Sequence, residues 1–199
     1  MSTIKTTNIT HGSNSGTANL VLASDGKVTI PEKKLYCPGA VVQVVSTTKT
    51  DVWTESCGEG AFSSNVVTGL TPSITPTASS SKILLTGYVV ISNDAGGAWG
   101  AGIVLCNGTT AIPEARGGAV GSRSQLSGKA ESSYLGTCIP INFLDSPATT
   151  NAITYGIKVW NGHTSTQNIS INYTNDSDSD NNNHIRAAST LTLMEIAGT

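Results

Sequence analysis

Three aspartates at alternating positions are the residues whose spacing most favours metal chemistry. The acidic loop, defined as residues 175–183, carries them as Asp176, Asp178 and Asp180. Alternating carboxylates are the hard oxygen donors of calcium loops, but the glycine and the glutamate of such loops are replaced here by Asn181 and Ala187. The alternative is a solvated hairpin loop whose charges are screened by water. We therefore expect no obligatory cofactor and leave a Ca²⁺ site open.

A second group of residues has the chemistry of a carbohydrate site. Tryptophan rings stack on sugar rings, and neighbouring polar groups hydrogen-bond the sugar hydroxyls. Trp160 is the best placed, because it ends a predicted strand and a turn at 161–162 follows it. The receptor-binding or glycan-binding candidates are Trp160, His163, Trp99 and Asp176. The alternative is that the aromatic residues belong to the core, where a β-sandwich more often places them.

Catalytic and zinc chemistry have little support in the sequence. The histidines are scattered, and no G-x-S-x-G motif accompanies them. The cysteines stand singly, without a CxxC motif or a Cys/His cluster, at Cys37, Cys57, Cys106 and Cys138. We expect them to be reduced, and we expect that the protein is not an enzyme and has no catalytic residue.

The composition excludes two classes of partner. Charged residues make up only 12% of the chain, against a typical value of about 25%, and the formal net charge is −2. A weakly acidic surface gives no reason to expect nucleic-acid binding. No apolar run approaches the roughly 20 residues of a membrane helix, and residues 1–7 lack the apolar core of a secretory signal. We therefore expect that the protein is made in a cytoplasm and does not insert into a membrane.

The elements that position these groups are predicted to be strands. Residues 153–160 alternate between apolar and other side chains, which indicates a half-buried strand. Further strands are predicted at 40–45, 51–55, 61–67, 82–92, 99–106, 135–143, 168–173 and 189–196, with a long loop at 114–133. The apolar run at 40–45 favours a strand covered on both faces. No window has the period of an amphipathic helix, so the sequence predicts an all-β, antiparallel sandwich, most simply a jelly roll.

The first 35 residues differ from the rest of the chain. Their few apolar residues are thinly spaced among small polar ones, and Ser24-Asp25-Gly26 marks a turn. Such a segment cannot bury enough apolar surface alone to offset its ordering entropy. It is either a disordered tail or an arm that docks on a partner, and we favour the arm. The sequence therefore predicts an arm at 1–35 and a sandwich domain at 36–199.

Several phrases of the sequence resemble short fibre proteins of tailed phages, especially those of marine and cyanobacterial hosts. They are the segments 42–50, 67–85, 141–147 and 189–198, together with the lead-in at 16–30. The resemblance implies a homotrimer with jelly-roll heads similar to those of C1q and TNF. It also implies an arm at 1–35 that binds another virion protein, either a tail adaptor or the major capsid protein.

The resemblance assigns expected roles to two further groups of residues. The expected trimer-interface residues are Leu191, Leu193, Met194 and Ile196. The expected virion-anchoring residues are Ile9, Leu20, Leu22, Val28 and Ile30. The function implied is a virion-surface fibre, made in the bacterial host cytoplasm, whose head adheres to the host surface. The alternatives are a capsid decoration protein that stabilises the shell and, from another class, a lectin-like or carbohydrate-active domain.

Overall fold

The computed structural model describes residues 6–9, 20–29, 37–95, 99–131, 136–174 and 184–198. These residues form three sheets in which all the strand pairs are antiparallel. They contain no α-helix, and their one helical piece is the 3₁₀ turn η1 (Pro113–Ala115). The predicted all-β, antiparallel class is confirmed. In the described ranges, no helix is long and apolar enough to cross a membrane.

The larger sheet of the sandwich has six strands arranged around the long strand β7. They are β4 (Val41–Lys49), β5 (Trp53–Cys57), β7 (Lys82–Asn93), β11 (Thr137–Asp145), β13 (Gln167–Ile171) and β14 (Ser189–Ile196). β7 pairs with β11 along one edge and with β14 and then β13 along the other. β4 lies outside β14, and β5 lies outside β13. β4 and β5 are therefore edge strands of this sheet.

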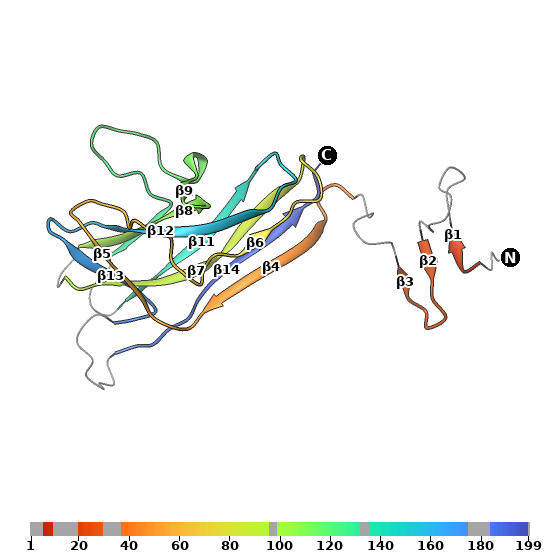
Figure 1. Ribbon diagram of the computed structural model, residues 1–199, viewed down its shortest axis with the longest axis horizontal. Coiled ribbons are helices and arrows are strands. Elements are labelled where there is room, and N and C mark those ends of the chain that lie inside the picture. The colour runs from red at the N-terminus through yellow and green to blue at the C-terminus, as the bar shows by residue number, and fades with distance from the viewer. Residues whose placement is uncertain are drawn as a thin grey trace.

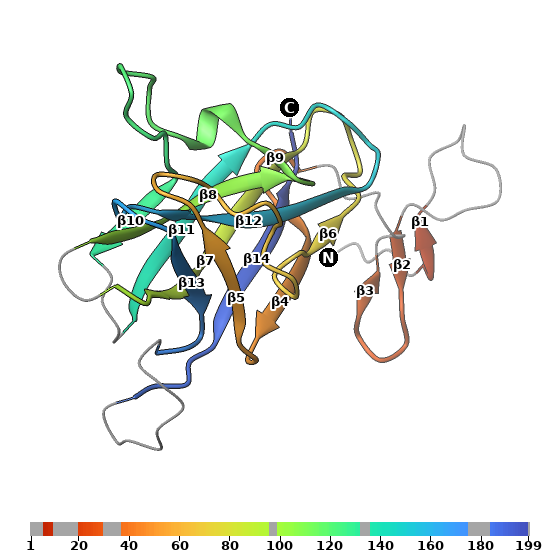
Figure 2. The same cartoon turned by 60° about the vertical axis from the view of Figure 1, so that its left-hand side comes forward.

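The smaller sheet faces the larger one across the core (Figures 1 and 2). Its strands are β6 (Ser73–Ile74), β8 (Gly100–Asn107), β9 (Thr110–Ala111), β10 (Gly128–Glu131) and β12 (Ile153–Asn161). Their order is β10-β8-β12-β6, with β9 paired to β8. Among the long strands, the chain crosses from one sheet to the other between β7 and β8 and at each step from β10 to β13, whereas β13 and β14 lie in the same sheet.

The inward side chains of both sheets form one apolar core. In β12, Tyr155 and Ile157 are fully buried, as the period-2 pattern predicts. The Tyr155 hydroxyl donates a hydrogen bond to Asp145 Oδ2 at 2.5 Å. Burial first, and then this carboxylate, raise the pKa of Tyr155 far above its usual value. The tyrosine therefore stays neutral and fixes the end of β11 against β12.

One carboxylate, Glu195, is buried in β14. Its Oε1 accepts hydrogen bonds from Thr77 N at 2.7 Å and Thr77 Oγ1 at 2.6 Å, and its Oε2 accepts one from Gln43 Nε2 at 2.5 Å. Burial alone would raise the pKa of Glu195, but the hydrogen bonds outweigh it and lower that pKa. The ionised group thereby fastens the segment before β7 to β4 and β14.

Three predicted elements differ in the structure. β4 is an edge strand, and Val41 and Val44 are 52% and 56% exposed, so its expected double cover is absent within the described chain. Residues 61–67 contain no strand, because Ser63 Oγ bonds Asn65 O at 2.7 Å in a turn and only Phe62 makes a bridge. The predicted loop at 114–133 overlaps η1 and contains the strand β10.

A third, small sheet precedes the sandwich. It consists of β1 (Asn8–Ile9), β2 (Leu20–Leu22) and β3 (Val28–Thr29), in the order β1-β2-β3. The predicted turn joins β2 and β3, where Asp25 Oδ1 accepts a hydrogen bond from Lys27 N and Gly26 has a φ of +83°. This N-terminal sheet lies apart from the sandwich (Figure 1). The expected boundary near residue 35 lies outside the described residues.

Candidate ligand-binding site at the far end of the sandwich

The turn between β12 and β13 carries the best candidate for a ligand-binding site. It lies at the end of the sandwich opposite the N-terminal sheet, where β8 begins and β12 ends (Figure 1). We call this end the far end and define its site by Trp99, Trp160 and His163. The other predicted receptor residue, Asp176, lies outside the described residues.

The buried side chain of Asn161 holds the turn in place through hydrogen bonds. Its Nδ2 donates to three carbonyl oxygens, those of Cys57, Gly58 and Ser165, at 2.9, 3.0 and 2.9 Å. Its Oδ1 accepts from His163 N at 2.9 Å, and the residue is fully buried. Because a buried amide with its hydrogen bonds satisfied is rigidly held, Asn161 fixes where the His163 ring emerges.

His163 is oriented by its own turn and touches Trp99. Its Nδ1 accepts from Ser165 N at 3.1 Å and also lies 3.2 Å from Gln167 Nε2. An Nδ1 that accepts from a backbone N–H is unprotonated, so in the neutral ring Nε2 carries the hydrogen. The Trp99 ring, 41% exposed, meets the imidazole edge-on with 4.8 Å between centroids. The pair combines an accessible aromatic surface with an N–H donor.

Trp160 is held more tightly than Trp99. Its Nε1 donates to Gly60 O at 2.8 Å, and its six-membered ring packs on Gly102 and Gly162. A side chain at Gly162 would come within 2.6 Å of this ring, so glycine is required there. Trp160 therefore forms part of the outer surface of the smaller sheet, while Trp99 presents more of its ring to solvent.

The proposed calcium residues cannot be placed. Asp176, Asp178 and Asp180 lie outside the described residues. Within the described ranges, no group of three or more His, Cys, Asp or Glu side chains could hold a metal ion. The two thiols inside the sandwich are also unsuited to chemistry, because burial, and next the charge of Glu55, raise the pKa of Cys57 to about 11, and burial raises the pKa of Cys106.

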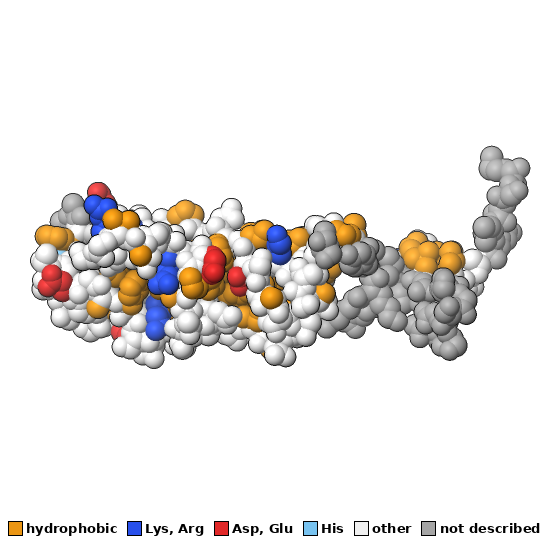
Figure 3. All heavy atoms as spheres, turned by 90° about the horizontal axis from the view of Figure 1, so that it is seen from above, with side chains coloured by type: hydrophobic (Ala, Val, Ile, Leu, Met, Phe, Trp, Pro, Cys, Tyr) orange, Lys and Arg blue, Asp and Glu red, His pale blue; other side chains and the backbone are white. Residues whose placement is uncertain are grey.

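The strand register brings the predicted anchoring residues of the N-terminal sheet together. Ile9 lies opposite Leu20, and Leu22 lies opposite Val28. Directly opposed residues share a face, as do residues two apart in a strand, so all four side chains lie on one face of this sheet. Ile9 is 49% and Val28 61% exposed, and Figure 3 shows apolar atoms gathered at this part of the surface. Ile30, the fifth residue of the group, lies outside the described residues.

The structure divides the four expected trimer-interface residues of β14. Leu191 and Leu193 point inward and are fully buried in the core of the single chain. They are therefore core residues, which the alternation of the strand makes inaccessible to a partner. Met194 and Ile196 lie on the opposite, outward face of the same strand and are half-buried.

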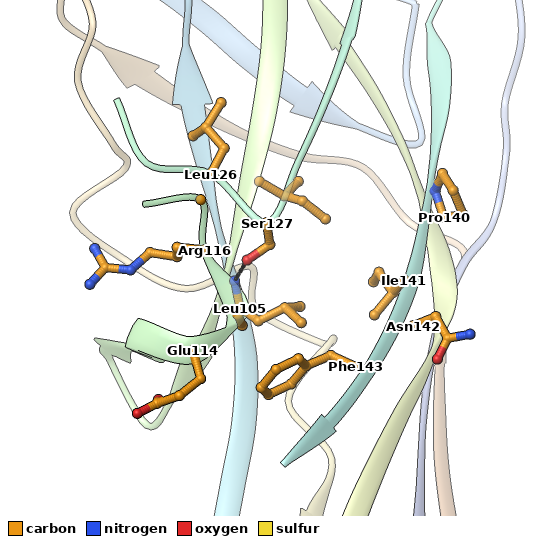
Figure 4. A pocket seen from close by; sticks show the side chains of 12 residues that line it. Leu105, Glu114, Arg116, Leu126, Ser127, Pro140, Ile141, Asn142 and Phe143 are labelled. Atoms are coloured by element: carbon orange, nitrogen blue, oxygen red, sulfur yellow. Dashed lines mark hydrogen bonds between the residues drawn. The ribbon is translucent and has the colours of Figure 1, made fainter. Parts of the chain in front are cut away.

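Sequence analysis did not anticipate a cavity between β8 and β11. Its volume is about 440 Å³, and its mixed lining includes the apolar residues Leu105, Ile141 and Phe143 and the polar residues Ser127 and Asn142 (Figure 4). Arg116 and Glu114 lie on the β8 side, and in Figure 4 their charged ends turn away from β11. Both residues belong to the segment predicted as loop, where no local pattern marks a cavity. The cavity brings together no set of residues suited to acid–base or nucleophilic chemistry.

Comparisons with known proteins assign no family. No model of a known protein family matches the chain, and no curated protein sequence matches it. Among solved structures, infectious bursal disease virus Gt strain aligns with 14% identity and a TM-score of 0.36, over 91% of this chain and 47% of that chain. The VP2 subviral particle of the same virus aligns with 13% identity and a TM-score of 0.36, over 78% of this chain and 37% of that chain. This chain thus spans less than half of either structure, and at these scores neither its fold nor its role is transferred from them.

Proposed function

We propose that this protein is a structural component of a phage virion, a short homotrimeric fibre with a jelly-roll head. Residues 1–35 form its arm, which docks on a tail adaptor or on the major capsid protein. The head presents its far end to the host surface, where Trp99, Trp160 and His163 contact a glycan. The protein is made in the bacterial host cytoplasm, acts at the virion surface, and has no enzymatic activity.

The observation that carries the proposal is the polarity of the chain. One end has an N-terminal sheet with an apolar face of four side chains that the sheet itself leaves accessible. The opposite end has an exposed tryptophan in contact with an oriented histidine. A protein that anchors at one end and adheres at the other needs this separation. The crossings between the two sheets, from β7 to β8 and at each step from β10 to β13, support the jelly-roll connectivity.

A capsid decoration protein is the second candidate. The apolar face of the N-terminal sheet also suits a clamp on the capsid shell. In that case the N-terminal sheet is the functional site and the far end has a secondary role. A carbohydrate-active enzyme is the weaker alternative, because it needs paired acids beside the aromatic site.

Immunogold labelling of intact particles from an infected culture tests the proposal. The antibody is raised against residues 40–199, and serum absorbed with the purified protein is the control. Gold at the tail is the expected result, whereas gold spread over the capsid favours the decoration protein. Particles without gold, in a culture that makes the protein, would refute a virion role of either kind.

The adhesive role of the far end is tested on host cells. Purified protein with Trp99→Ala should bind cells more weakly than the unchanged protein, by about tenfold if one stacking interaction of about 1–1.5 kcal/mol is lost. Val120→Ala, at an exposed apolar position in another loop, is the matched control. Equal binding of all three proteins would contradict a role for the Trp99 ring.

A further inference from the structure

The outward surface of four neighbouring strands has an apolar row that the described chain leaves uncovered. We define the outer face as the outward residues of β4, β14, β7 and β11, which lie side by side in Figure 2. In one line across these strands, Val44 lies opposite Met194, Met194 opposite Leu84, and Leu84 opposite Leu144. Val44 is 56% and Leu144 47% exposed. Aligned apolar side chains on an exposed face mark an interaction surface more than scattered ones do.

Four polar residues of the outer face, on β4 and β14, are hydrogen-bonded to each other in pairs. Ser46 Oγ lies 2.8 Å from Thr192 Oγ1, and Thr48 Oγ1 lies 3.0 Å from Thr190 Oγ1. Removing a hydroxyl from water is costly chiefly when it loses its partners. These hydroxyl pairs keep a partner within the sheet, so another molecule can cover this part of the face at a small desolvation cost.

The charges of the outer face favour a second copy over a charged partner. Among the outward residues of its four strands, Lys82 is the one formal charge, and it lies beyond the apolar row. The outward face of the smaller sheet, in contrast, carries Lys129, Glu131 and Lys158. A surface that meets copies of itself around a rotation axis must avoid bringing like charges together. The outer face of the larger sheet meets this condition.

The free edge of β4 borders the same surface. β4 has nine residues, and in the described part of the chain it pairs only with β14. It contains no proline, and its one lysine, Lys49, is turned inward and bonded to Asp51 at 2.7 Å. The six residues before Lys49, at 43–48, contain no charge and no proline, so this stretch of the edge is open to pairing with another element. The free edge of β4 and the apolar row thus form one continuous surface that another molecule can contact.

The size of the face is close to what a stable contact needs. Four strands about 4.8 Å apart, with β4 and β11 nine residues long, give a footprint of about 600 Å². Each partner in a stable pair buries about 800 Å². Loops around the face, together with a second contact in a closed ring, supply the difference.

We infer that a second copy of this chain packs against the outer face of the larger sheet, with Val44, Leu84, Met194 and Leu144 at the centre of the contact. The inference rests on the homotrimer of the proposed function and names its surface. The inferred contact residues are accessible to a partner, whereas Leu191 and Leu193, which the sequence suggested for the trimer interface, are buried in the core. The N-terminal sheet and the far end stay free for their own contacts.

The test is the molar mass of the purified chain by light scattering coupled to size-exclusion chromatography. Val44→Glu and Leu144→Glu, made singly, each place a charge in the centre of the contact. Association should weaken by roughly a hundredfold or more in each variant, because a buried charge would lack a partner. Val120→Glu is the matched control, at a residue with nearly the same exposure, 57%, outside the outer face. Circular dichroism verifies that each variant is folded.

The outcomes separate this inference from the proposed function. A trimer that becomes monomeric in the two outer-face variants but not in the control supports the inference. A trimer that persists in folded variants overturns the outer face as the contact but leaves the virion role intact. A monomeric unchanged protein overturns both the inference and the homotrimer, while immunogold labelling still decides the virion role.

A second measurement covers the case in which a variant fails to fold. Cys138 lies on the outer face of β11 and is exposed in the single chain, as is Cys37 outside that face. In the assembled protein, a thiol reagent should modify Cys37 at least tenfold faster than Cys138. Equal rates for the two thiols in the assembled protein would overturn the inference without any mutation.

Discussion

Replacing Asn161 by aspartate should loosen the far end while keeping its shape. The carboxylate retains the oxygen that accepts from His163 N at 2.9 Å. It loses the two N–H hydrogens that three carbonyl oxygens share at 2.9–3.0 Å. With about 1 kcal/mol for each lost hydrogen bond and about 1–3 kcal/mol for a buried group left unpaired, the free energy of unfolding should fall by about 2–4 kcal/mol at neutral pH.

The loss should depend on pH in one direction. A carboxyl group surrounded by carbonyl oxygens has its pKa raised above the unfolded value of about 3.9, because burial and the neighbouring oxygens disfavour its charge. A group whose pKa is raised by folding contributes its stability below the unfolded pKa and loses it as the pH rises. The difference between variant and unchanged protein should therefore be smaller near pH 4 than at pH 7.

Urea unfolding followed by tryptophan fluorescence at the two pH values measures this difference. Asn151→Asp is the matched control, because Asn151 is exposed in the turn before β12, outside the outer face, and its replacement should change the unfolding free energy by no more than about 0.5 kcal/mol. Equal stability of Asn161→Asp and the unchanged protein would refute the role given to the Asn161 amide. A loss of the same size at both pH values would refute the electrostatic part of the reasoning.

Two further substitutions and one thiol-labelling experiment test the sandwich itself. Folding lowers the pKa of Glu195, so the ionised side chain stabilises the protein above the unfolded pKa of about 4.3, and this stabilisation is lost as the pH falls. The melting temperature of Glu195→Gln should therefore fall less steeply in acid than that of the unchanged protein. At Gly87, φ is +150° and a Cβ would overlap the carbonyl oxygen of Thr190. Gly87→Ala should therefore lower the unfolding free energy by about 2–5 kcal/mol. Gly108→Ala should lower it by less, because a Cβ at Gly108 would contact no other atom. Cys57 should react with a thiol reagent at pH 8 only after urea unfolding, and rapid reaction in the native protein would contradict its burial.

Local patterns in the sequence predict the strands well where one side of a strand faces the core. The alternation around Tyr155 and Ile157 identifies β12 and its inward side correctly, since burial in a sheet has a period of two residues. The apolar run of β4 is less informative. Continuous apolar character is compatible with a central strand or with an edge strand beside an uncovered face, and pairing with β14, far along the chain, decides between them.

The candidate sites show the same limit. The tryptophan and histidine side chains that suit a glycan site are visible in the sequence, but the contact between Trp99 and His163 depends on β8 and β12 being neighbours. Asn161 looks like an ordinary turn residue, because nothing local shows that its amide spans to Cys57 and Gly58. The division of β14 into core leucines and an outward Met194 required only the correct phase of the alternation.

The first and last residues of the sandwich are hydrogen-bonded to each other, and this arrangement determines how the molecule responds to mechanical load. Gly39 N donates to Ala197 O at 2.8 Å and Ala197 N donates to Ala40 O at 2.9 Å, so β4 starts and β14 finishes at the same end. Force applied between these two points would unzip the antiparallel ladder one hydrogen bond at a time. Tension between the N-terminal sheet and the far end would instead act along the strands and shear many hydrogen bonds together. The chain is therefore built to withstand pulling along its length better than peeling at its base.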